Sequence, residues 1–533
     1  MRISYKRVAI CYFLVALMMF VCVFRVFTVM KDETYAAAAE SERKRTVTLN
    51  YSRGSIFDCN MQRITNSKSV YYAVIFNQPS ALAVLYNYFT SEETKAIIDE
   101  IQKNGFALRT VSREIVCDGI YCVKANVHAD DSLLAKHIVG YISSEGRGVT
   151  GLEAAFEYVL AGTQQNTLSF SINGIGQLIH GEEPVLNYDY GKENCGVKTT
   201  IDSEIQQIAE QEAMAIESGA IIITEVSTGK IRAMVSRPDY KISNLATALT
   251  DSNEPMLNRA LCTYNIGSVF KPIVAAAGYE NNISYETVCK GYTDIDGLTF
   301  TCHKLSGHGN MDVTSALKYS CNSFFYNFIQ KTGADKVIEL AKKAGFETSV
   351  QLANGLYCKA GSLGNKTIIK SSPRALANLS IGQGELMLSP LVITNCYMAI
   401  ANDGSYRTPS LIEGIVENGK LIDEYPLPAS VKLMSDSTAS KLKNDLATVL
   451  TEGGTGEKAN PALTTAAGKT GTAQTGILKD GKKVTNSWFC GFFPFDQPQY
   501  AVTILSQNAS DGCASIFAAV ADETTKLVQS RSD

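Results

Sequence analysis

The longest apolar stretch of the chain lies near its N-terminus, where residues 8–24 read VAICYFLVALMMFVCVF and VFTVM continues the run to Met30. A run of this length can cross a bilayer as a single helix, with the interrupting Arg25 extending its charge toward the interface. We therefore expect a transmembrane anchor at 8–30.

Charge next to this run predicts its orientation. Segment 1–7 carries the basic residues Arg2, Lys6 and Arg7, which predicts a cytoplasmic tail and places the rest of the chain outside the cytoplasm. A cleaved signal peptide is the alternative, because YAAAAE at 35–40 offers small residues for cleavage. The apolar run exceeds a signal core of about 7–15 residues, which favours an uncleaved anchor and a polar stalk at 31–45.

After the stalk, polar and apolar residues alternate as they do in strands. RTVTLNYSRGSIFD at 45–58 and YYAVIFNQ at 71–78 predict strands, 91–103 predicts a helix, and RTVSREIVCDGIYCVKANV at 109–127 predicts a hairpin. Together these elements predict an α+β domain over 46–195.

The pattern changes near residue 198, where Asp202 and Ser203 are candidate caps for a helix with apolar residues at helical spacing. GAIIITEVSTGKIRAMVSRP at 219–238 predicts a hairpin, and residues from 275 to about 400 are mostly helical. Three strands follow, with KDGKK as the turn between the first two, and then a terminal helix: TAAGKTGTAQTG at 465–476, NSWFCGFFP at 486–494, YAVTILSQ at 500–507 and the helix at 514–529. The pattern predicts one α/β domain over 196–533, with five antiparallel strands and a helical insertion between the first two and the last three.

Composition adds little to this picture. A chain of 533 residues is too long for one core and predicts two or three domains. Charged residues make up 19% and apolar ones 45%, as in ordinary globular proteins. The net charge of −4 gives no indication of a nucleic-acid partner.

Fourteen cysteines are a high number, and two of them lie in the predicted anchor. We expect no metal site, because no Cys-x-x-Cys occurs and only five His are present. Most of the scattered cysteines are interpreted as small buried apolar residues. Cys289 and Cys302, which bracket a turn-rich loop, are the candidate disulfide pair. Both a disulfide and two reduced thiols stay open for them.

Candidate chemistry begins with Ser-x-x-Lys, which occurs five times, starting at Ser41, Ser227, Ser268, Ser315 and Ser440. One occurrence alone is no indication of catalysis, because serine at a helix start usually caps the helix and lysine is usually exposed. Ser268 with Lys271 differs in standing at the start of the small, apolar run FKPIVAAAG.

Two further short motifs each occur more than once, and their positions in the chain distinguish the occurrences. Ser-x-Asn starts at Ser171, Ser320 and Ser506, and Lys-Thr-Gly starts at Lys331 and Lys469. Lys331 closes a helical run before Gly333, as expected for a structural helix end. Lys469 instead lies in the extended stretch AAGKTGTAQ, where glycine permits close approach of a ligand.

Ser268-x-x-Lys271, Ser320-x-Asn322 and Lys469-Thr470-Gly471 follow one another in the order known from penicillin-binding proteins and related β-lactamases. The chain resembles a class B penicillin-binding protein, a membrane-anchored peptidoglycan D,D-transpeptidase, over nearly all its length. Further segments carry the resemblance: RGSIFD (53–58), HIVGY (137–141), GVTGLEAAFE (148–157), TTIDSEIQQIAE (199–210), TGKIRAMVSRP (228–238), NRAL (258–261) and GQG (382–384). Departures at Cys59, Met61 and Ile266 touch no catalytic side chain, and GQG itself is interpreted as a tight turn near the site.

The resemblance implies the fold of this family, with a five-stranded sheet and helical subdomain in the transpeptidase domain (196–533) and an N-terminal pedestal domain (46–195). It also implies the roles of the site residues. Ser268 is the nucleophile, Lys271 its base, Ser320 a proton relay and Asn322 a binder of the substrate's amide. Lys469, Thr470 and Gly471 form the strand that holds the terminal carboxylate, and the backbone N–H groups of Ser268 and Thr472 form the oxyanion hole.

Elementary physics fits these roles. Three residues along a helix place Lys271 beside Ser268, and the helix start favours developing negative charge. A lysine among apolar residues has a lowered pKa, so it can take the serine proton as a neutral amine.

The resemblance implies cross-linking of stem peptides that end in D-Ala-D-Ala, inhibition by β-lactams and no cofactor or metal. No segment resembles a glycosyltransferase domain, so a separate membrane polymerase of glycan strands is the implied partner. Two alternatives stay open at this point. One is a D,D-carboxypeptidase or β-lactamase with the same acylation chemistry, and the other is a non-enzymatic β-lactam sensor or wall scaffold.

Overall fold

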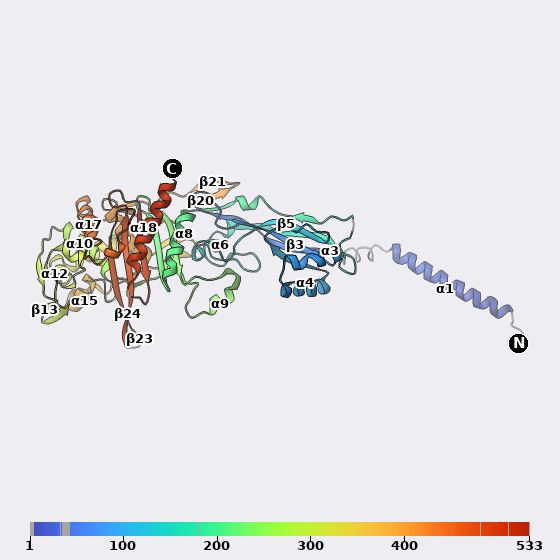
Figure 1. Cartoon of the computed structure of the whole chain (residues 1–533), viewed down its shortest axis with the longest axis horizontal. Coiled ribbons are helices and arrows are strands. Elements are labelled where there is room, and N and C mark those ends of the chain that lie inside the picture. The colour runs from blue at the N-terminus through green and yellow to red at the C-terminus, as the bar shows by residue number, and fades with distance from the viewer. Residues whose placement is uncertain are drawn as a thin grey trace. The chain divides into compact units, whose positions relative to one another are not determined.

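The computed structural model describes residues 5–31, 34, 43–179, 181–479, 481–509 and 511–531 (Figure 1). Its contacts divide the chain into two units. The N-terminal unit comprises Met1–Ser52, Lys68–Val127 and Gly162–Tyr190, and the C-terminal unit comprises Arg53–Ser67, His128–Ala161 and Gly191–Asp533. The units interleave along the sequence, so a single boundary near residue 195 does not separate them.

Helix α1 (Tyr5–Lys31) corresponds to the predicted anchor. Among the described residues it is the one helix that is long and apolar enough to cross a membrane. Its side chains are exposed along nearly the whole helix, as expected of an element whose apolar partners are lipid rather than protein. Residues 1–4 of the predicted tail and most of the predicted stalk, 32–33 and 35–42, lie outside the described residues.

The N-terminal unit is built around β3 (Lys68–Phe76), which pairs with β4 (Phe106–Val111) on one side and β5 (Ile120–Val127) on the other. Ala73 and Ile75 pack in a core that includes residues of α4 (Ser91–Asn104), whereas Val74 and Phe76 pack in a second core with residues of β1 (Lys44–Arg53) and β6 (Ala161–Ser171). Because successive side chains of a strand point to opposite faces, β3 is buried on both. The smaller elements here are α3 (Pro79–Val84) and β7 (Val185–Asn187).

The hairpin predicted at 109–127 is wrong. Its two strands, β4 and β5, form, but each pairs antiparallel with β3 rather than with the other. The apolar strand β3 hydrogen-bonds to one strand on each of its edges and is therefore the central strand. If β4 and β5 had paired with each other as a hairpin, β3 could not lie between them. The predicted strand at 71–78 and helix at 91–103 are confirmed as β3 and α4.

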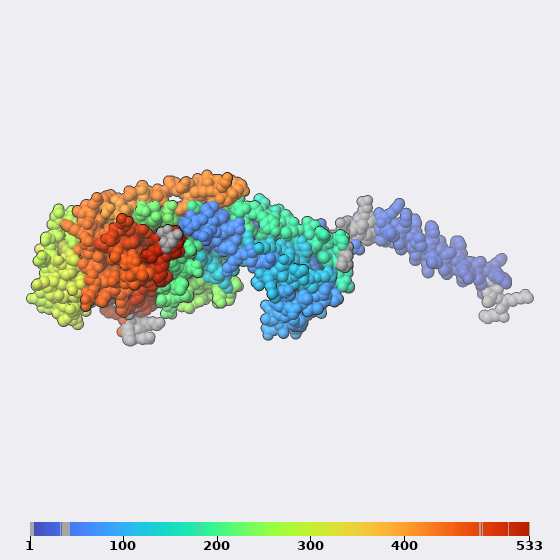
Figure 2. Space-filling view, turned by 45° about the horizontal axis from the view of Figure 1, so that its top comes forward, coloured from blue at the N-terminus to red at the C-terminus, as the bar shows by residue number. Residues whose placement is uncertain are grey.

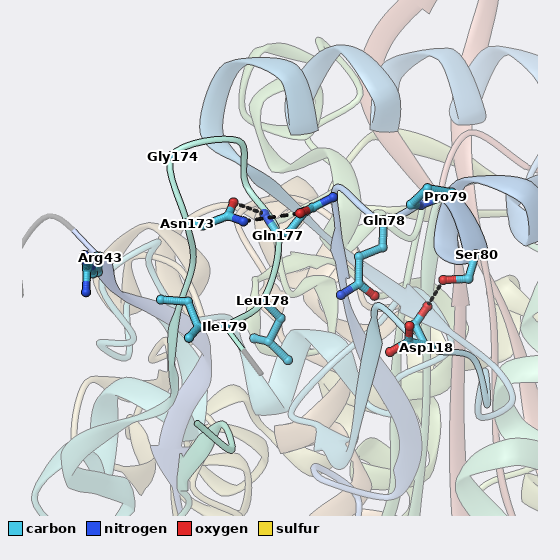
Figure 3. Close-up of a pocket in the computed structure, with 10 residues that line it drawn as sticks. All are labelled: Arg43, Gln78, Pro79, Ser80, Asp118, Asn173, Gly174, Gln177, Leu178 and Ile179. Atoms are coloured by element: carbon cyan, nitrogen blue, oxygen red, sulfur yellow. Dashed lines mark hydrogen bonds between the residues drawn. The ribbon is translucent and has the colours of Figure 1, made fainter. Parts of the chain in front are cut away.

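A polar pocket of about 620 Å³ opens in the N-terminal unit (Figure 3). Its walls are tied together locally, since Ser80 Oγ donates to the Asp118 carbonyl at 2.8 Å and Asn173 Nδ2 donates to Gln177 Oε1 at 3.2 Å. None of the residues implicated in catalysis by the sequence lines it.

The C-terminal unit contains the predicted five-stranded antiparallel sheet, in the order β10-β9-β25-β24-β23. The early hairpin gives two strands and the end of the chain gives three, as expected: β9 (Gly219–Glu225), β10 (Ile231–Arg237), β23 (Ala467–Lys479), β24 (Lys482–Phe493) and β25 (Tyr500–Ser506). Asp480, within the predicted KDGKK turn, lies outside the described residues.

Helices cover both faces of this sheet. Phe489 of β24 packs against Phe517 of α18 (Cys513–Ser530), with ring centroids 4.5 Å apart. The next residue along β24 is paired with Thr503, whose hydroxyl lies 2.8 Å from that of Thr394 in α16 (Pro390–Ala401). Adjacent pairs point to opposite faces, so α18 and α16 lie on opposite sides. Helix α8 (Ser203–Glu212), which also packs on α18, begins at the predicted cap Asp202, which accepts from the N–H groups of Glu204 and Ile205.

The insertion between the two sets of strands is largely helical, as predicted: α10 (Lys271–Glu280), α11 (Val313–Lys318), α12 (Asn322–Thr332), α13 (Ala334–Lys343), α14 (Lys366–Ser371), α15 (Pro373–Ser380) and α17 (Asp436–Thr448). Gly333 ends α12 with a positive φ of 90°, which agrees with the structural interpretation of Lys331. One segment of the insertion that forms strands is 287–311, with β12 (Thr287–Cys289), β13 (Tyr292–Ile295), β14 (Leu298–Thr301) and β15 (Gly309–Met311).

A second sheet of this unit joins distant segments, in the order β2-β8-β20-β21: β2 (Ser55–Phe57), β8 (Gly196–Thr199), β20 (Ile412–Glu417) and β21 (Lys420–Glu424). The backbone N–H of Cys59 also donates to the Ile201 carbonyl at 2.7 Å. Figure 2 shows the surface of this unit, where green atoms from the middle of the chain lie beside orange and red atoms from its end. Short elements complete it: α5 (Lys136–Val139), α6 (Gly151–Ala155), α7 (Glu157–Leu160), α9 (Leu245–Thr250), β11 (Tyr264–Asn265), β16 (Val350–Ala353), β17 (Leu356–Cys358), β18 (Met387–Leu388), β19 (Ser405–Arg407) and β22 (Ser430–Lys432).

Arg53, the first residue of RGSIFD, meets GVTGLEAAFE in a buried ionic network. Its Nε lies 2.6 Å from Glu153 Oε2 and its Nη2 lies 2.7 Å from Glu157 Oε2, with the Arg53 and Glu153 side chains 1% and 2% exposed. His128 Nε2 lies 2.7 Å from the other Glu153 oxygen. Burial acts to raise the pKa of Glu153, but His128 and Arg53 outweigh it and hold that pKa below its usual value.

Arg53→Ala should therefore destabilise the C-terminal unit by about 3–5 kcal/mol, because it leaves the buried Glu153 carboxylate without one of its two partners. Urea unfolding followed by fluorescence of Trp488, the single tryptophan of the chain and a residue of this unit, measures the change. Lys526→Ala is the control, since it breaks an exposed ion pair with Glu523 and should cost less than about 1 kcal/mol. Equal losses for the two variants would contradict the assignment.

Candidate active site

The turn that carries Ser268 is held by two glycines. Strand β11 leads into a short 3-10 helix, Gly267–Phe270, which continues as α10. The Gly267 N–H donates to the Gly382 carbonyl at 2.8 Å, and a Cβ at Gly382 would lie 1.9 Å from the Gly267 oxygen. The GQG segment therefore packs directly behind Ser268, as the sequence predicted, and leaves the serine half-buried.

Lys271, the first residue of α10, is fully buried and forms three short polar contacts. Its Nζ lies 2.6 Å from the Ser320 carbonyl oxygen, 2.7 Å from Asn322 Oδ1 and 3.1 Å from Ser320 Oγ. The ring of Phe325 covers it, with the centroid 5.3 Å from Nζ. Desolvation by burial lowers the pKa of Lys271 to about 7. Near neutral pH the side chain is therefore divided between ammonium and neutral amine.

The Ser320–Asn322 turn joins α11 to α12 in a conformation that places both side chains on Lys271. Ser320 has a φ of 55°, the left-handed region that non-glycine residues rarely adopt, at a cost on the order of 1–3 kcal/mol. This turn directs the Ser320 carbonyl toward Lys271, and Asn322, at the start of α12, presents its Oδ1 to the same amine. The motifs Ser320-x-Asn322 and Ser268-x-x-Lys271 are therefore joined by hydrogen bonds between the Lys271 amine and the residues Ser320 and Asn322.

Lys469, Thr470 and Gly471 lie on β23, the edge strand of the sheet, beside the Ser268 turn. A Cβ at Gly471 would lie 2.9 Å from a Val269 methyl, and one at Gly267 would lie 2.6 Å from the Thr472 carbonyl oxygen. Glycine at both positions lets the strand and the turn touch through their backbones. The structure therefore brings all eight residues implicated in catalysis and binding into one site.

Lys469 is a second fully buried lysine. Its Nζ donates to the Thr470 carbonyl at 3.2 Å and Thr470 Oγ1 at 3.4 Å. Burial, and then the nearby charge of Lys271, place the pKa of Lys469 well below its usual value. Neither lysine forms an ion pair with a carboxylate in the part of the chain that the structure describes. A site with two buried amines and no acidic partner is suited to an anionic ligand.

Three supporting residues carried no signal in the sequence. Thr455 Oγ1 accepts from Thr470 Oγ1 at 3.1 Å and donates to the Lys318 carbonyl, which ties β23 to the end of α11. Trp488 Nε1 donates to the Asn265 carbonyl, and the Tyr397 hydroxyl donates to the Val269 carbonyl, both at 3.0 Å. Each contact joins segments far apart in the chain, so no local pattern could have revealed it.

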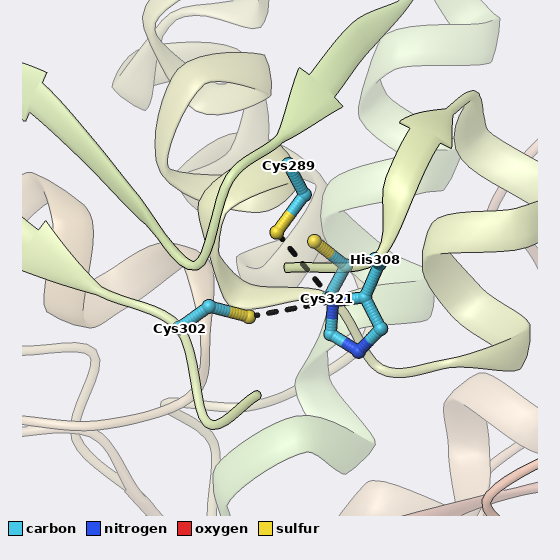
Figure 4. A group of neighbouring side chains, drawn as sticks. All are labelled: Cys289, Cys302, His308 and Cys321. Atoms are coloured by element: carbon cyan, nitrogen blue, oxygen red, sulfur yellow. Dashed lines mark hydrogen bonds between the residues drawn. The ribbon is translucent and has the colours of Figure 1, made fainter. Parts of the chain in front are cut away.

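Cys321, the middle residue of Ser-x-Asn, lies in an unexpected cluster with Cys289, Cys302 and His308 (Figure 4). The sequence, which contains no Cys-x-x-Cys pair, predicts no metal site. In the structure, four side chains of metal-binding type from separate positions lie together. All fourteen cysteines are free, so Cys289 and Cys302 are not joined by a disulfide in this structure.

Comparison with known proteins agrees with this geometry. The model of the penicillin binding protein transpeptidase domain matches residues 219–526, more than half of the chain. The chain belongs to the penicillin-binding protein transpeptidase family.

Relatives of this family cover most of the chain. Stage V sporulation protein D of Bacillus subtilis is 26% identical over 524 residues, which cover 89% of this chain and 77% of the relative. Peptidoglycan D,D-transpeptidase MrdA of Haemophilus influenzae is 27% identical over 410 residues, and the match spans 70% of this chain but only 61% of MrdA. The crystal structure of penicillin binding protein 3 from Mycobacterium tuberculosis, complexed with aztreonam, has a TM-score of 0.65 at 23% identity and covers 91% of this chain and 97% of its own.

The rate of acylation by a β-lactam should rise with pH through a midpoint near 7, because only the neutral amine of Lys271 can accept the serine proton. Lys271→Arg should remove this rise and lower the rate at least about a hundredfold, since a guanidinium stays protonated at these pH values. Stopped-flow measurement of the acylation rate from about pH 6 to 9 tests both statements. An arginine variant with the wild-type rate and profile would exclude Lys271 as the base.

Proposed function

We propose that the chain is a peptidoglycan D,D-transpeptidase that works through an acyl-enzyme on Ser268. The observation that carries the proposal is the fully buried Lys271 amine, hydrogen-bonded to Ser320 and Asn322 and placed one helical turn after Ser268. A serine of this kind, next to a base that is partly neutral at physiological pH, is an activated nucleophile.

Acylation follows from the hydrogen bonds of Lys271. A neutral amine has two N–H groups, which its two shortest contacts, to the Ser320 carbonyl and Asn322 Oδ1, occupy. The lone pair is left to accept a hydroxyl proton. As it takes the proton of Ser268, the serine Oγ bonds to the carbonyl carbon of the penultimate D-Ala, the peptide C–N bond breaks, and the terminal D-Ala leaves after its nitrogen receives a proton relayed through Ser320.

Deacylation reverses these roles. The amine of a neighbouring stem peptide attacks the acyl carbon, its proton passes to the site, and Ser268 recovers its own proton as the new peptide bond forms. Atoms balance, with one D-Ala released for each cross-link formed.

The strand Lys469–Gly471 binds the terminal carboxylate of the donor peptide. Two buried amines without an acidic partner among the described residues favour an anion here, and the Thr470 hydroxyl, which donates to Thr455 Oγ1 in the free site, turns to the carboxylate when the peptide binds. Asn322 binds the amide of the peptide through the part of its side chain that Lys271 does not occupy. The backbone N–H groups of Ser268 and Thr472 stabilise the oxyanion, at roughly 3–4 kcal/mol for each donor.

The chain acts at the membrane surface. Helix α1 serves as a single-pass anchor, and the basic residues Arg2, Lys6 and Arg7 favour a cytoplasmic N-terminus and a catalytic unit outside the cytoplasm. Peptidoglycan stem peptides and β-lactams are its ligands. Polymerisation of glycan strands is assigned to a separate membrane polymerase, because no segment of this chain resembles a glycosyltransferase.

Ser268→Ala should abolish covalent labelling by a fluorescent penicillin, because the bond to the label forms at this oxygen. Ser440→Ala is the matched control, since Ser440 begins another Ser-x-x-Lys but is exposed on α17, and its labelling should equal that of the wild type. In-gel fluorescence of the full-length protein in detergent measures both. A stable adduct on the Ser268→Ala protein would refute the nucleophile assignment.

Release of D-Ala from a stem peptide ending in D-Ala-D-Ala should require an added acceptor amine, such as a labelled D-amino acid, which becomes incorporated into the product. Mass spectrometry with and without the acceptor distinguishes the reactions. Release of D-Ala at the same rate without an acceptor would identify a carboxypeptidase, and turnover of the penicillin would identify a β-lactamase.

A further inference from the structure

Four metal-type ligands lie together beside the site. The sulfur atoms of Cys289, Cys302 and Cys321 and a ring nitrogen of His308 all lie within 4.8 Å of one another. His308 Nδ1 is 3.5 Å from Cys289 Sγ and 3.6 Å from Cys302 Sγ. The three cysteines are buried, at 2%, 2% and 0% exposure. Figure 4 shows the three sulfur atoms and the imidazole directed toward a common point.

Strand pairing brings the first three ligands together. Cys289 ends β12 and is paired with Gly309 of β15, and the N–H of His308 donates to the Cys289 carbonyl at 3.1 Å. The hairpin β13–β14 returns the chain so that the Cys302 N–H donates to the Gly291 carbonyl at 2.8 Å. The segment 287–311, here called the knuckle, therefore presents three ligands on one side. Cys321, at the start of α12, adds the fourth.

The distances match a metal site better than a hydrogen-bonded one. A tetrahedral zinc with bonds of about 2.3 Å to sulfur and 2.0–2.1 Å to nitrogen separates these two ligand atoms by about 3.6 Å, which is the spacing of both sulfur–nitrogen pairs. The Nδ1 lone pair of His308 satisfies only one of these contacts by hydrogen bonding, since a neutral imidazole nitrogen accepts from one thiol, and the other histidine nitrogen near Cys302, His303 Nδ1, is farther from its Sγ, at 3.8 Å. A zinc ion at the centre satisfies all four ligands at once.

The knuckle also lacks a core of its own. Among its apolar side chains only Ile295 and Met311 are buried besides the two cysteines, while Val288, Tyr292, Leu298 and Leu305 are exposed. Glycine makes its tight folding possible, since a Cβ at Gly291 would lie 1.9 Å from the Leu305 carbonyl oxygen. Segments this small with so little buried apolar surface usually need a metal or a disulfide to hold one structure.

We propose that Cys289, Cys302, His308 and Cys321 bind one structural Zn²⁺ ion, which fixes the Ser320–Asn322 turn of the active site. The set of three cysteines and one histidine is a closed, four-coordinate one, typical of zinc that stabilises structure rather than reacts. Binding displaces the three thiol protons and leaves thiolates on the metal. The ion holds Cys321 Sγ, and Cys321 lies between the two residues that bind Lys271.

A positioning role follows from the strain of that turn. Ser320 adopts a left-handed φ of 55°, and its carbonyl must stay 2.6 Å from Lys271 Nζ. A metal bond to the next residue opposes relaxation of this conformation. In catalysis a misplacement of about 1 Å can cost about a hundredfold in rate. The effect of the metal on acylation rests on the proposed function, whereas binding of the metal does not.

Metal content of the full-length protein tests the site. Wild-type protein purified in detergent, with reductant and without chelator, should carry about one zinc per chain by inductively coupled plasma mass spectrometry. Cys321→Ala and His308→Ala should each lose most of it. Cys396→Ala, which changes a fully buried cysteine of α16 outside the cluster, should keep it.

Two measurements on the wild type remain informative if a variant fails to fold. Replacement of zinc by Co²⁺ should give the visible bands and thiolate charge-transfer absorption of tetrahedral cobalt with sulfur ligands. Mass mapping of the non-reduced protein should find no disulfide among the three cysteines. A metal-free protein with free thiols, or a disulfide joining any two of them, would overturn the proposal.

Removal of zinc by a chelator should slow labelling by a fluorescent penicillin at least about tenfold, and Zn²⁺ but not Mg²⁺ should restore it. An unchanged labelling rate in protein shown to have lost its zinc would overturn the positioning role. Failure of the proposed function gives a different result, since zinc-loaded wild-type protein would then show no labelling at all.

Discussion

The buried amine of Lys271 is the interaction on which the site depends. Three oxygen atoms of the Ser320–Asn322 turn contact it, the Phe325 ring covers it, and it is fully buried. Placing an amine in such surroundings is unfavourable for its charged form, so the fold exchanges solvation of the ammonium for a base that is partly neutral. The left-handed conformation of Ser320 is the geometric requirement for that exchange, because it directs the carbonyl to the amine.

Close backbone packing fixes the turn that carries Ser268, the proposed nucleophile. The Ser268 turn is held between Gly382 on one side and the edge strand β23 on the other, at separations that a Cβ at Gly382, Gly267 or Gly471 would close. Trp488 and Tyr397 then fix the flanking carbonyls of Asn265 and Val269. A site assembled from three distant segments is rigid only if each segment is held in place. Here the close backbone contacts and the buried hydrogen bonds of Trp488 and Tyr397 hold these segments.

The C-terminal unit uses buried charge in two different ways. In the C-terminal unit, Arg53, Glu153 and His128 form a paired ionic network, in which each buried charge has a partner. The active site of the same unit leaves Lys271 and Lys469 without a carboxylate among the described residues. Paired charges hold structure, whereas unpaired buried amines leave free energy that binding of an anion can recover. The N-terminal unit relies instead on β3, whose two faces serve two apolar cores.

The sequence alone determined the long apolar helix α1, and the two hairpin strands and three terminal strands of the main sheet, and it singled out Ser268 as the proposed nucleophile. Each of these depends on local pattern, such as apolar length, period and turn residues, or on the order of three short motifs. Local pattern failed at 109–127, because β3 competes for both strands there. It also missed Thr455 and the ligand cluster around Cys321. The Thr455–Lys318 contact spans 137 positions of the chain. The four ligands lie within positions 289–321, but strand pairing and the start of α12 bring them together, so in both cases only the tertiary fold decides the neighbours.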